Sequence, residues 1–157
     1  MLKVKDVMVK DVVSIQSDQT VLNAVNLMNE NKIGCLVVLE NGRVVGIVTE
    51  RDMLERVIAV SAEPAKTFVR QVMSKPVVSV EPETLLEEAV ELMFEHRIKK
   101  LPVMERGETV ARLVGLVTLT DIARIHPALM KTMRKLFEDR SETPPRQMEK
   151  VMNFYIV

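Results

Sequence analysis

Two short stretches of the chain bring together residue types that can bind a ligand. Residues 46–52 read Gly-Ile-Val-Thr-Glu-Arg-Asp, and residues 115–121 read Gly-Leu-Val-Thr-Leu-Thr-Asp. A glycine, two aliphatic residues, a threonine and an aspartate three positions later are typical of a strand that runs directly into the first turn of a helix. Free backbone N–H groups, a hydroxyl and a carboxylate meet at such a junction.

The threonine and the aspartate have two interpretations. A threonine at a helix start with an acidic residue three positions later forms a capping box, which needs no ligand. Alternatively, Asp52 and Asp121 each offer two acceptor oxygens suited to the paired hydroxyls of a ribose. Thr49 and Thr118, with the helix N-terminal amides, are then suited to a phosphate. Both roles can coexist, and both stay open at this point.

The two stretches belong to an internal repeat. At an offset of 65, residues 7–42 match residues 72–107 at 16 of 36 positions. The offset then becomes 69, because the turn after Gly107 is four residues longer than the turn after Gly42. Self-similarity of this kind predicts one structural unit that is used twice.

The hydrophobic periodicity changes in a fixed order within the unit. Residues 12–15 favour a short β-branched strand, and residues 20–31 have the spacing of an amphipathic helix. Residues 35–40 and 44–49 predict two strands joined by an Asn-Gly hairpin turn. The apolar stripe in 50–61 predicts a second helix. The order is therefore β-α-β-β-α, which indicates an α/β fold.

The second unit follows the same order from 77 to 125. We place the first unit at 4–61, a linker at 62–68, the second unit at 69–126 and a C-terminal helix and tail at 127–157. A unit of about 60 residues buries little apolar surface by itself. We therefore expect the two units to pack sheet to sheet as a pseudo-twofold pair, with clefts between them where small ligands bind.

The C-terminal region predicts a helix and an apolar end. Residues 127–138 begin with a proline, which suits the first turn of a helix, and continue with an apolar stripe. Residues 148–157 are too apolar to stay in water. We expect them to pack on the body of the protein or against a second subunit.

Composition excludes several classes of protein. The 157 residues are 47% hydrophobic and 28% charged, and 22 basic residues balance 22 acidic ones, which argues against a strongly basic nucleic-acid binder. No segment approaches the ~18 apolar residues of a membrane span, and the first residues lack an apolar signal region. We expect a soluble, cytoplasmic protein. Cys35 is the single cysteine, which excludes an internal disulfide, and its apolar neighbours predict a buried small hydrophobe.

No catalytic arrangement can be assembled from these residues. His96 and His126 are 30 positions apart and lack a nearby constellation of carboxylates or cysteines. The sequence contains no Ser/His/Asp arrangement and no Gly-rich phosphate loop. We expect no enzymatic activity, no metal site and no catalytic cofactor.

The pair of units resembles a tandem of CBS (cystathionine β-synthase) domains, also called a Bateman module, over residues 4–126. The resemblance is carried by the two Gly-aliphatic-aliphatic-Thr-x-x-Asp stretches, each after a strand, a helix and two strands, and by residues 98–103, which look like the second strand of the family. It implies that an adenosine-containing ligand, such as AMP, ADP, ATP or S-adenosylmethionine, binds between the repeats without catalysis.

The resemblance also implies which residues hold the ligand. Asp52 and Asp121 would bind ribose hydroxyls, with Thr49 and Thr118 beside them. In the family, the adenine side of a site often comes from the partner repeat. One implied site would pair Asp121, Thr118 and Leu116 with Val13, Ser14, Ile33 and Gly34. The other would pair Asp52, Thr49 and Ile47 with Val78, Ser79 and Ile98.

Basic residues near the motifs add phosphate contacts to this expectation. Lys99 and Lys100 occupy positions where related modules carry phosphate-binding side chains, and Arg51 is a further candidate. The alternative for all three is a solvated helix end or surface. Gly34 and Cys35 replace the two lysines in the first repeat, so the two sites should differ in charge.

These expectations combine into a regulatory module that works as a homodimer. An adenine nucleotide would act as a regulatory ligand that favours one arrangement of the repeats, and a partner protein would detect it. A first rival is a ligand-free structural or protein-interaction module. A second rival, disfavoured by the neutral charge, is nucleic-acid binding through basic residues of the tail helix, namely Lys131, Arg134, Lys135 and Arg140.

Overall fold

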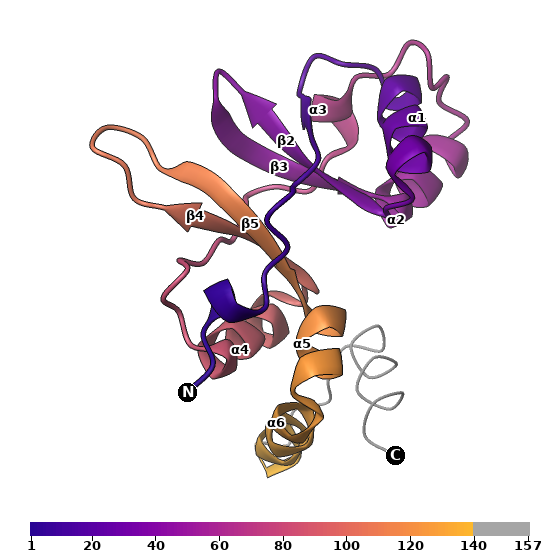
Figure 1. Ribbon diagram of the computed structural model, residues 1–157. Coiled ribbons are helices and arrows are strands. Elements are labelled where there is room, and N and C mark those ends of the chain that lie inside the picture. The colour runs from indigo at the N-terminus through magenta and orange to yellow at the C-terminus, as the bar shows by residue number, and fades with distance from the viewer. Residues whose placement is uncertain (140–157) are drawn as a thin grey trace. The chain divides into compact units, whose positions relative to one another are not determined.

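The computed structural model describes residues 1–139, and these form two compact units. One unit comprises residues 11–77. The other combines residues 1–10 with residues 78–139. Figure 1 shows both units and labels most of their helices and strands. The mixed α/β class and the duplicated order of elements predicted from the sequence are both confirmed.

A three-stranded sheet forms the centre of the unit 11–77. Its strands are β1 (Ser14–Gln16), β2 (Cys35–Glu40) and β3 (Arg43–Thr49), in that order, with β1 parallel and β3 antiparallel to β2. Asn41 and Gly42 connect β2 to β3 with φ angles of 50° and 75°. These positive angles are what a two-residue hairpin turn requires, so the predicted Asn-Gly turn is confirmed.

The helices of this unit cover the sheet with apolar side chains. They are α1 (Val21–Asn31), α2 (Glu50–Met53), which continues into a π-helical segment (Leu54–Ile58), and α3 (Val69–Val72). Thr20 caps α1 through its side-chain oxygen, which accepts a hydrogen bond from the Asn23 N–H at 3.2 Å. The buried core of the unit consists of Ile15, Val21, Ala24, Met28, Leu36, Val38, Val48, Met53, Val57, Val69 and Val72.

The other unit repeats this plan, but the first strand of the repeat is reduced to a single bridge. It contains a 3-10 turn (Val4–Asp6), α4 (Leu86–His96), β4 (Lys100–Glu105), β5 (Arg112–Thr118), α5 (Leu119–Ile125) and α6 (Pro127–Asp139). β4 and β5 form an antiparallel pair. The expected first strand of the repeat is only a single parallel bridge between Val80 and Val103.

Pro102 accounts for the reduced strand. In the first repeat, the Val37 N–H donates to the carbonyl of Val13 at 3.3 Å and begins the pairing of β1. Pro102 occupies the position that corresponds to Val37 and has no N–H to donate. The pairing therefore begins two residues later, at Val80, whose N–H donates to the Pro102 carbonyl at 3.1 Å.

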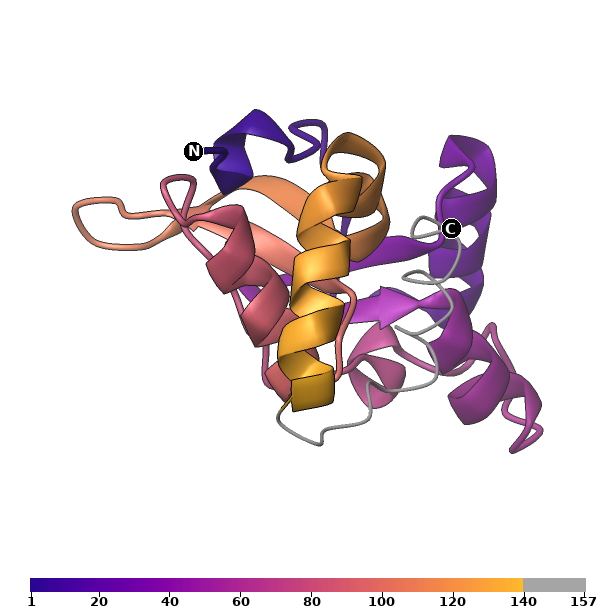
Figure 2. The ribbon, with the colours of Figure 1, turned by 90° about the horizontal axis from the view of Figure 1, so that it is seen from below.

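Helix α6 completes the core of this unit. It packs against α4 and α5, and Figure 2 shows it alongside α4. Leu129, Met130 and Met133 from the predicted apolar stripe are buried, whereas Leu136 is 41% exposed. The predicted packing of residues 148–157 lies outside the described residues.

The boundaries of the compact units differ from those of the sequence repeats at both lead-in segments. Residues 1–10 begin the first repeat but pack with α4, where Val4 and Val7 are buried. Residues 69–77 begin the second repeat but pack with α1 and β3 of the unit 11–77, where Val69 and Val72 are buried. The boundaries 4–61 and 69–126 therefore describe the two repeats in the sequence. In the structure, the lead-in of each repeat packs in the compact unit that contains the rest of the other repeat, which we call an exchange of lead-ins.

The two lead-ins form equivalent backbone hydrogen bonds. The Val4 N–H donates to the Thr84 carbonyl at 2.8 Å, and the Val69 N–H donates to the Gln19 carbonyl at 2.8 Å. Further along each lead-in, Val9 forms an antiparallel bridge with Leu116, and Ser74 forms one with Ile47. Each lead-in therefore runs beside the strand that ends in the Thr-x-x-Asp motif.

No helix among residues 1–139 has the length and apolar character needed to cross a membrane.

Candidate functional site

Both Thr-x-x-Asp motifs lie at a junction between a strand and a helix. Thr49 ends β3 and caps α2, and Thr118 ends β5 and caps α5. The Asp52 N–H donates to the Thr49 hydroxyl oxygen at 3.3 Å, and the Asp121 N–H donates to the Thr118 hydroxyl oxygen at 3.1 Å. The predicted junction and the predicted threonine cap are confirmed in both repeats.

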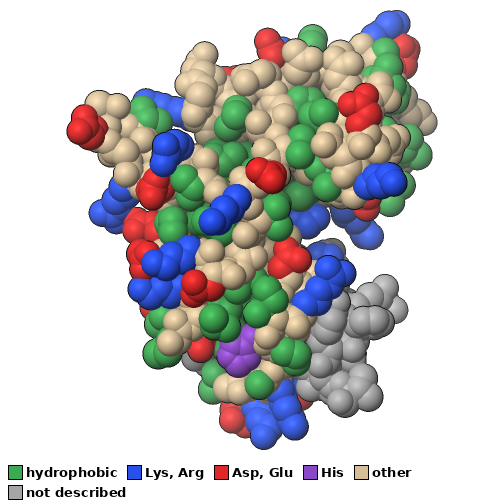
Figure 3. All heavy atoms as spheres, viewed as in Figure 1, with side chains coloured by type: hydrophobic (Ala, Val, Ile, Leu, Met, Phe, Trp, Pro, Cys, Tyr) green, Lys and Arg blue, Asp and Glu red, His purple; other side chains and the backbone are tan. Residues whose placement is uncertain are grey.

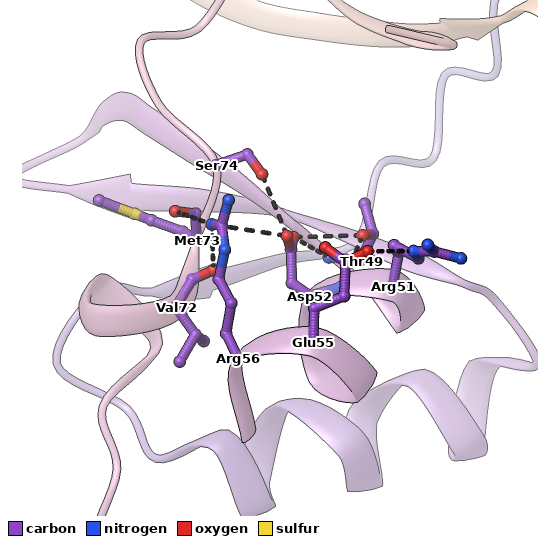
Figure 4. A network of polar contacts seen from close by, with 8 residues as sticks. All are labelled: Thr49, Arg51, Asp52, Glu55, Arg56, Val72, Met73 and Ser74. Atoms are coloured by element: carbon purple, nitrogen blue, oxygen red, sulfur yellow. Dashed lines mark hydrogen bonds and ion pairs between the residues drawn. The ribbon is translucent and has the colours of Figure 1, made fainter. Parts of the chain in front are cut away.

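Asp52 is buried, and both of its carboxylate oxygens are engaged (Figure 4). Its Oδ2 accepts the Thr49 N–H at 2.9 Å and lies 3.2 Å from the Thr49 hydroxyl, which completes the capping box. Its Oδ1 accepts the Ser74 hydroxyl at 3.1 Å and lies 3.5 Å from Nη1 of Arg56. Asp52 is only 4% exposed as a whole residue, and these contacts hold its carboxylate inside the unit.

Arg56 connects this network to the lead-in of the second repeat. Its Nη1 donates to the carbonyls of Val72 and Met73 at 2.8 and 2.9 Å. The same atom faces Oδ1 of Asp52, as Figure 4 shows. The first motif therefore holds its own helix and also fastens residues 72–74.

Asp121 is partly exposed and has fewer partners. Its Oδ2 accepts the Thr118 hydroxyl at 2.8 Å. Within residues 1–139, its Oδ1 accepts no hydrogen bond and no ion pair reaches the carboxylate. An ionised carboxylate has about four acceptor positions on its two oxygens, so Asp121 retains capacity that Asp52 has used.

The glycine of each motif is explained by the lead-in that crosses it. A Cβ at Gly46 would lie 2.6 Å from Sδ of Met73 and 3.1 Å from the Ser74 carbonyl oxygen. A Cβ at Gly115 would lie 2.5 Å from Sδ of Met8 and 3.1 Å from the Val9 carbonyl oxygen. The two glycines are therefore required by close packing, and this requirement is the same in both repeats.

The strand facing each threonine carries different residues in the two repeats. Lys100 lies directly opposite Thr118 in the β4–β5 pair, whereas Cys35 lies opposite Thr49 in the β2–β3 pair. Side chains at such paired positions project from the same face, with Cβ atoms about 5 Å apart. Lys100 therefore lies beside the second motif, and its contact with a phosphate stays a prediction. Cys35, the first residue of β2, is half-buried and not buried as predicted.

The Glu50 carboxylate lies beside the first motif, and its counterpart at the second motif is apolar. Gly34, which replaces Lys99, leaves space that the Glu50 carboxylate approaches, with Oε1 3.2 Å from the position of a Gly34 Cβ. Leu119 occupies the place of Glu50 in the second repeat and is fully buried. The first motif therefore has an additional negative charge, and the second has lysines at both corresponding positions.

The other predicted residues are distributed over both units. Ile47 and Leu116 contact the lead-ins through the bridges with Ser74 and Val9. Arg51 is exposed and pairs with Glu55 at 2.5 Å, which favours its surface interpretation. Ser14 is in β1 and Ser79 is exposed. The partly buried apolar residues that pack against the core of their own unit are Val13, Ile33, Val78 and Ile98. The pairing of residues across the two repeats stays a prediction.

A cavity of about 650 Å³ lies in the unit that contains α4. Its lining includes the predicted site residue Ser79 but neither Thr118 nor Asp121. Its lining residues are Ser79, Val80, Glu81, Thr84, Glu88, Glu91, Leu92, Glu95, Met104, Arg106 and Ala111. Arg106 is paired with Glu81 at 2.7 Å, which leaves an acidic surplus in this cavity.

The described part of the chain gives no support for a metal site or for nucleic-acid binding. Among residues 1–139, no three His, Cys, Asp or Glu side chains come together as a metal site. On the face in Figure 3, basic and acidic side chains alternate without a continuous basic patch. On α6, Arg134 pairs with Glu138 at 3.0 Å, which lowers the positive charge available for nucleic acid.

Sequence reasoning missed the partners of Asp52. Ser74 and Arg56 are 22 and 4 positions away, and neither belongs to the motif. One signal in the sequence could have identified Ser74 and Arg56, because both positions carry a different residue type in the other repeat. Ser74 corresponds to Val9 at the offset of 65, and Arg56 corresponds to Ile125 at the offset of 69.

Comparison with protein families and sequences gives a consistent match. The model of the CBS domain matches residues 4–59 and 69–127. The CBS domain-containing protein YhcV of Bacillus subtilis is 37% identical over 123 residues, which cover 78% of this chain and 84% of that protein. The inosine-5'-monophosphate dehydrogenase of Methanocaldococcus jannaschii is also 37% identical over 123 residues, which cover 78% of this chain but only 23% of the enzyme.

Solved structures show the same fold. One of them is the CBS domain pair of protein MJ0100 in complex with 5'-methylthioadenosine and S-adenosyl-L-methionine. It superposes with a TM-score of 0.71 at 23% identity and covers 82% of this chain and 98% of that one. At this identity the likeness shows the fold alone.

Proposed function

Because the chain belongs to the CBS-domain family and carries two copies of the domain in tandem, we propose that it is a regulatory module that binds an adenosine-containing ligand. AMP, ADP, ATP and S-adenosylmethionine are the candidate ligands. The second Thr-x-x-Asp motif supplies the ribose contact. The bound ligand favours one conformation of the module, and a homodimer presents that conformation to a partner protein.

The observation that carries this proposal is the state of Asp121. This carboxylate is partly exposed, and its Oδ1 accepts no hydrogen bond from residues 1–139. Two adjacent ribose hydroxyls are donors that match such an acceptor. Lys100, directly across the strand pair from Thr118, adds positive charge at the side where a phosphate would lie.

Two further findings support a binding role. The matched region covers only 23% of inosine-5'-monophosphate dehydrogenase, so the similarity is to a small part of that enzyme. The MJ0100 pair, which shares the fold, was solved with two adenosyl compounds. We extend this ligand class to the present chain as part of the proposal.

A thermal-shift screen tests the ligand class. Each of AMP, ADP, ATP and S-adenosylmethionine is added separately, with GTP as the control that matches ATP in charge and phosphate number. A ligand at 100 times its dissociation constant stabilises the folded state by about 2.7 kcal/mol. We expect at least one adenosyl compound to raise the melting temperature and GTP to have a smaller effect. If none does, the ligand-free interaction module replaces this function.

An ATP analogue that lacks the 2' and 3' hydroxyls of the ribose tests the ribose contact. We expect 2',3'-dideoxy-ATP to bind the wild type at least tenfold more weakly than ATP does, because a hydrogen bond to a charged group contributes about 1.5–3 kcal/mol. In Asp121→Ala, ATP and its dideoxy analogue should bind equally weakly. Unequal binding in this variant would place the ribose elsewhere.

A further inference from the structure

The two motifs differ at the carboxylate oxygen that a ligand would use. Oδ1 of Asp52 already accepts the Ser74 hydroxyl and faces the Arg56 guanidinium. At the corresponding positions near Asp121 the chain has Val9 and Ile125, which are 48% and 55% exposed. Valine and isoleucine carry no hydrogen-bonding side-chain atom, so neither can occupy Oδ1 of Asp121.

The two lead-ins cross their motifs with equivalent backbone hydrogen bonds, so the side chain of the lead-in decides whether it reaches Oδ1. Ser74 and Val9 occupy equivalent positions on the two lead-ins, because each forms an antiparallel bridge with the strand of its motif. The Ser74 N–H donates to the Ile47 carbonyl at 2.8 Å, and the Val9 N–H donates to the Leu116 carbonyl at 2.9 Å. A serine at position 9 would therefore be placed to reach Asp121 as Ser74 reaches Asp52.

Arg56 makes the first motif difficult to open. The same guanidinium nitrogen that faces Asp52 also donates to the carbonyls of Val72 and Met73. A ribose that displaced Arg56 would leave both carbonyls without this donor, and a displaced Ser74 would lose its acceptor. Binding at Asp52 must compete with contacts that already exist in the free protein.

Charge also favours the second motif for a phosphate-bearing ligand. The Glu50 carboxylate lies against Gly34 beside the first motif. At the second motif, the corresponding positions carry Leu119 and Lys99, and Lys100 faces Thr118. This difference is independent of the hydrogen bonds to Asp52 and acts in the same direction.

We propose that each chain takes one adenosyl ligand, through Asp121, and that Ser74 and Arg56 close the first motif. This inference rests on the proposed function, since it assigns the same ligand class to one of two copies. It makes Ser74 and Arg56 the residues that determine the number of ligands bound. The first motif acts as a fastener for residues 72–74 instead of a ligand site.

Calorimetric titration with ATP, and separately with ADP, AMP and S-adenosylmethionine, tests the stoichiometry. We expect one site per wild-type chain and two sites in Ser74→Val/Arg56→Ile, which places the residues of the second repeat in the first. The reverse variant, Val9→Ser/Ile125→Arg, is the matched control and should weaken binding at Asp121 at least tenfold. Two sites in the wild type would overturn the inference and leave the proposed function intact.

A variant on the open motif keeps the test decisive if the double variants fail to fold. Asp121→Ala should weaken ATP binding at least tenfold and leave no site of wild-type affinity, because the first motif is closed. Retention of one site of unchanged affinity in Asp121→Ala would show that Asp52 binds ligand and would overturn the inference. Absence of binding to the wild type by all four adenosyl compounds would overturn the proposed function, and the inference with it.

Discussion

The two Thr-x-x-Asp junctions have the same threonine cap and the same crossing lead-in, but they differ in the residues around the carboxylate. In both, the threonine hydroxyl accepts the aspartate N–H, and a glycine admits a crossing lead-in. Asp52 is enclosed by Thr49, Ser74 and Arg56, whereas Asp121 contacts only Thr118 among the described residues. The comparison teaches that a duplicated motif preserves its cap, while residues outside the motif decide whether the carboxylate stays available.

The stability cost of removing each aspartate should separate the two junctions most clearly. Asp52→Ala removes a cap and the acceptor of the Ser74 and Arg56 contacts, so we expect a loss of about 2 to 4 kcal/mol in the free energy of unfolding. Asp121→Ala removes little more than a cap contact, and we expect about 1 kcal/mol or less. Urea unfolding of both variants measures this. Equal losses would remove the distinction between the junctions.

Alanine at either glycine should affect both junctions alike. In Gly46→Ala and Gly115→Ala the new Cβ meets a methionine sulfur and a lead-in carbonyl oxygen at nearly the same distances. The methionine can move, but the backbone must also shift, and we expect each variant to lose about 1 to 3 kcal/mol. Thermal unfolding of the pair gives the comparison. A large loss in only one would mean that the two lead-ins are held differently.

The hydroxyl of Ser74 should contribute a smaller amount. Ser74→Ala deletes the hydrogen bond to Asp52 and leaves Arg56 in place, so we expect a loss of about 1 kcal/mol. Ser74→Ala combined with Asp52→Ala should cost less than the sum of the single variants, because the two side chains interact. Val9→Ala in the other lead-in serves as the control without a polar contact. Strict additivity in the double variant would contradict the Ser74–Asp52 bond.

The lead-in of the first repeat should show a weak dependence on acid that the other lead-in lacks. Hydrogen bonds from Lys3 and then Lys5 lower the pKa of Glu83 to about 2 from its ordinary value of 4.5. Because the folded-state pKa is lowered, this contribution to stability is present above pH 4.5 and is lost as the pH falls towards 2. The other lead-in instead places Arg70 over the ring of Phe68, 4.4 Å from its centroid.

Unfolding at pH 5 and at pH 3 measures this effect. Glu83 is on the surface, so the expected change is small. Wild type should lose slightly more stability than Glu83→Gln between these two pH values, since the variant has no charge to lose. The same loss in both proteins would mean that the exposed pairs with Lys3 and Lys5 do not contribute.

Local signals in the sequence were sufficient to predict most of the fold. The Asn41-Gly42 turn, the helix capped by Thr20 and the duplicated Thr-x-x-Asp junctions each depend on neighbouring residues. The exchange of lead-ins was not predicted, because Val4 and Val69 gain their contacts from segments tens of residues away. The reduced strand at Val80 follows from Pro102, which is also distant in sequence.

The candidate site was predictable only in part for the same reason. Composition and spacing identify Asp52 and Asp121 as equivalent, but the structure distinguishes them through Ser74, a residue on an exchanged lead-in. The approach of the Glu50 carboxylate to Gly34 also depends on how the start of a helix packs against a loop. Such differences become visible only when the side chains are placed around each carboxylate.

A crystal structure of the chain grown with ATP tests the central claim most directly. The account predicts adenosine with its ribose hydroxyls within hydrogen-bond distance of Oδ1 of Asp121, while Asp52 keeps its contacts with Ser74 and Arg56. A nucleotide bound against Asp52, or one in the acidic cavity beside α4 with Asp121 unoccupied, would contradict it.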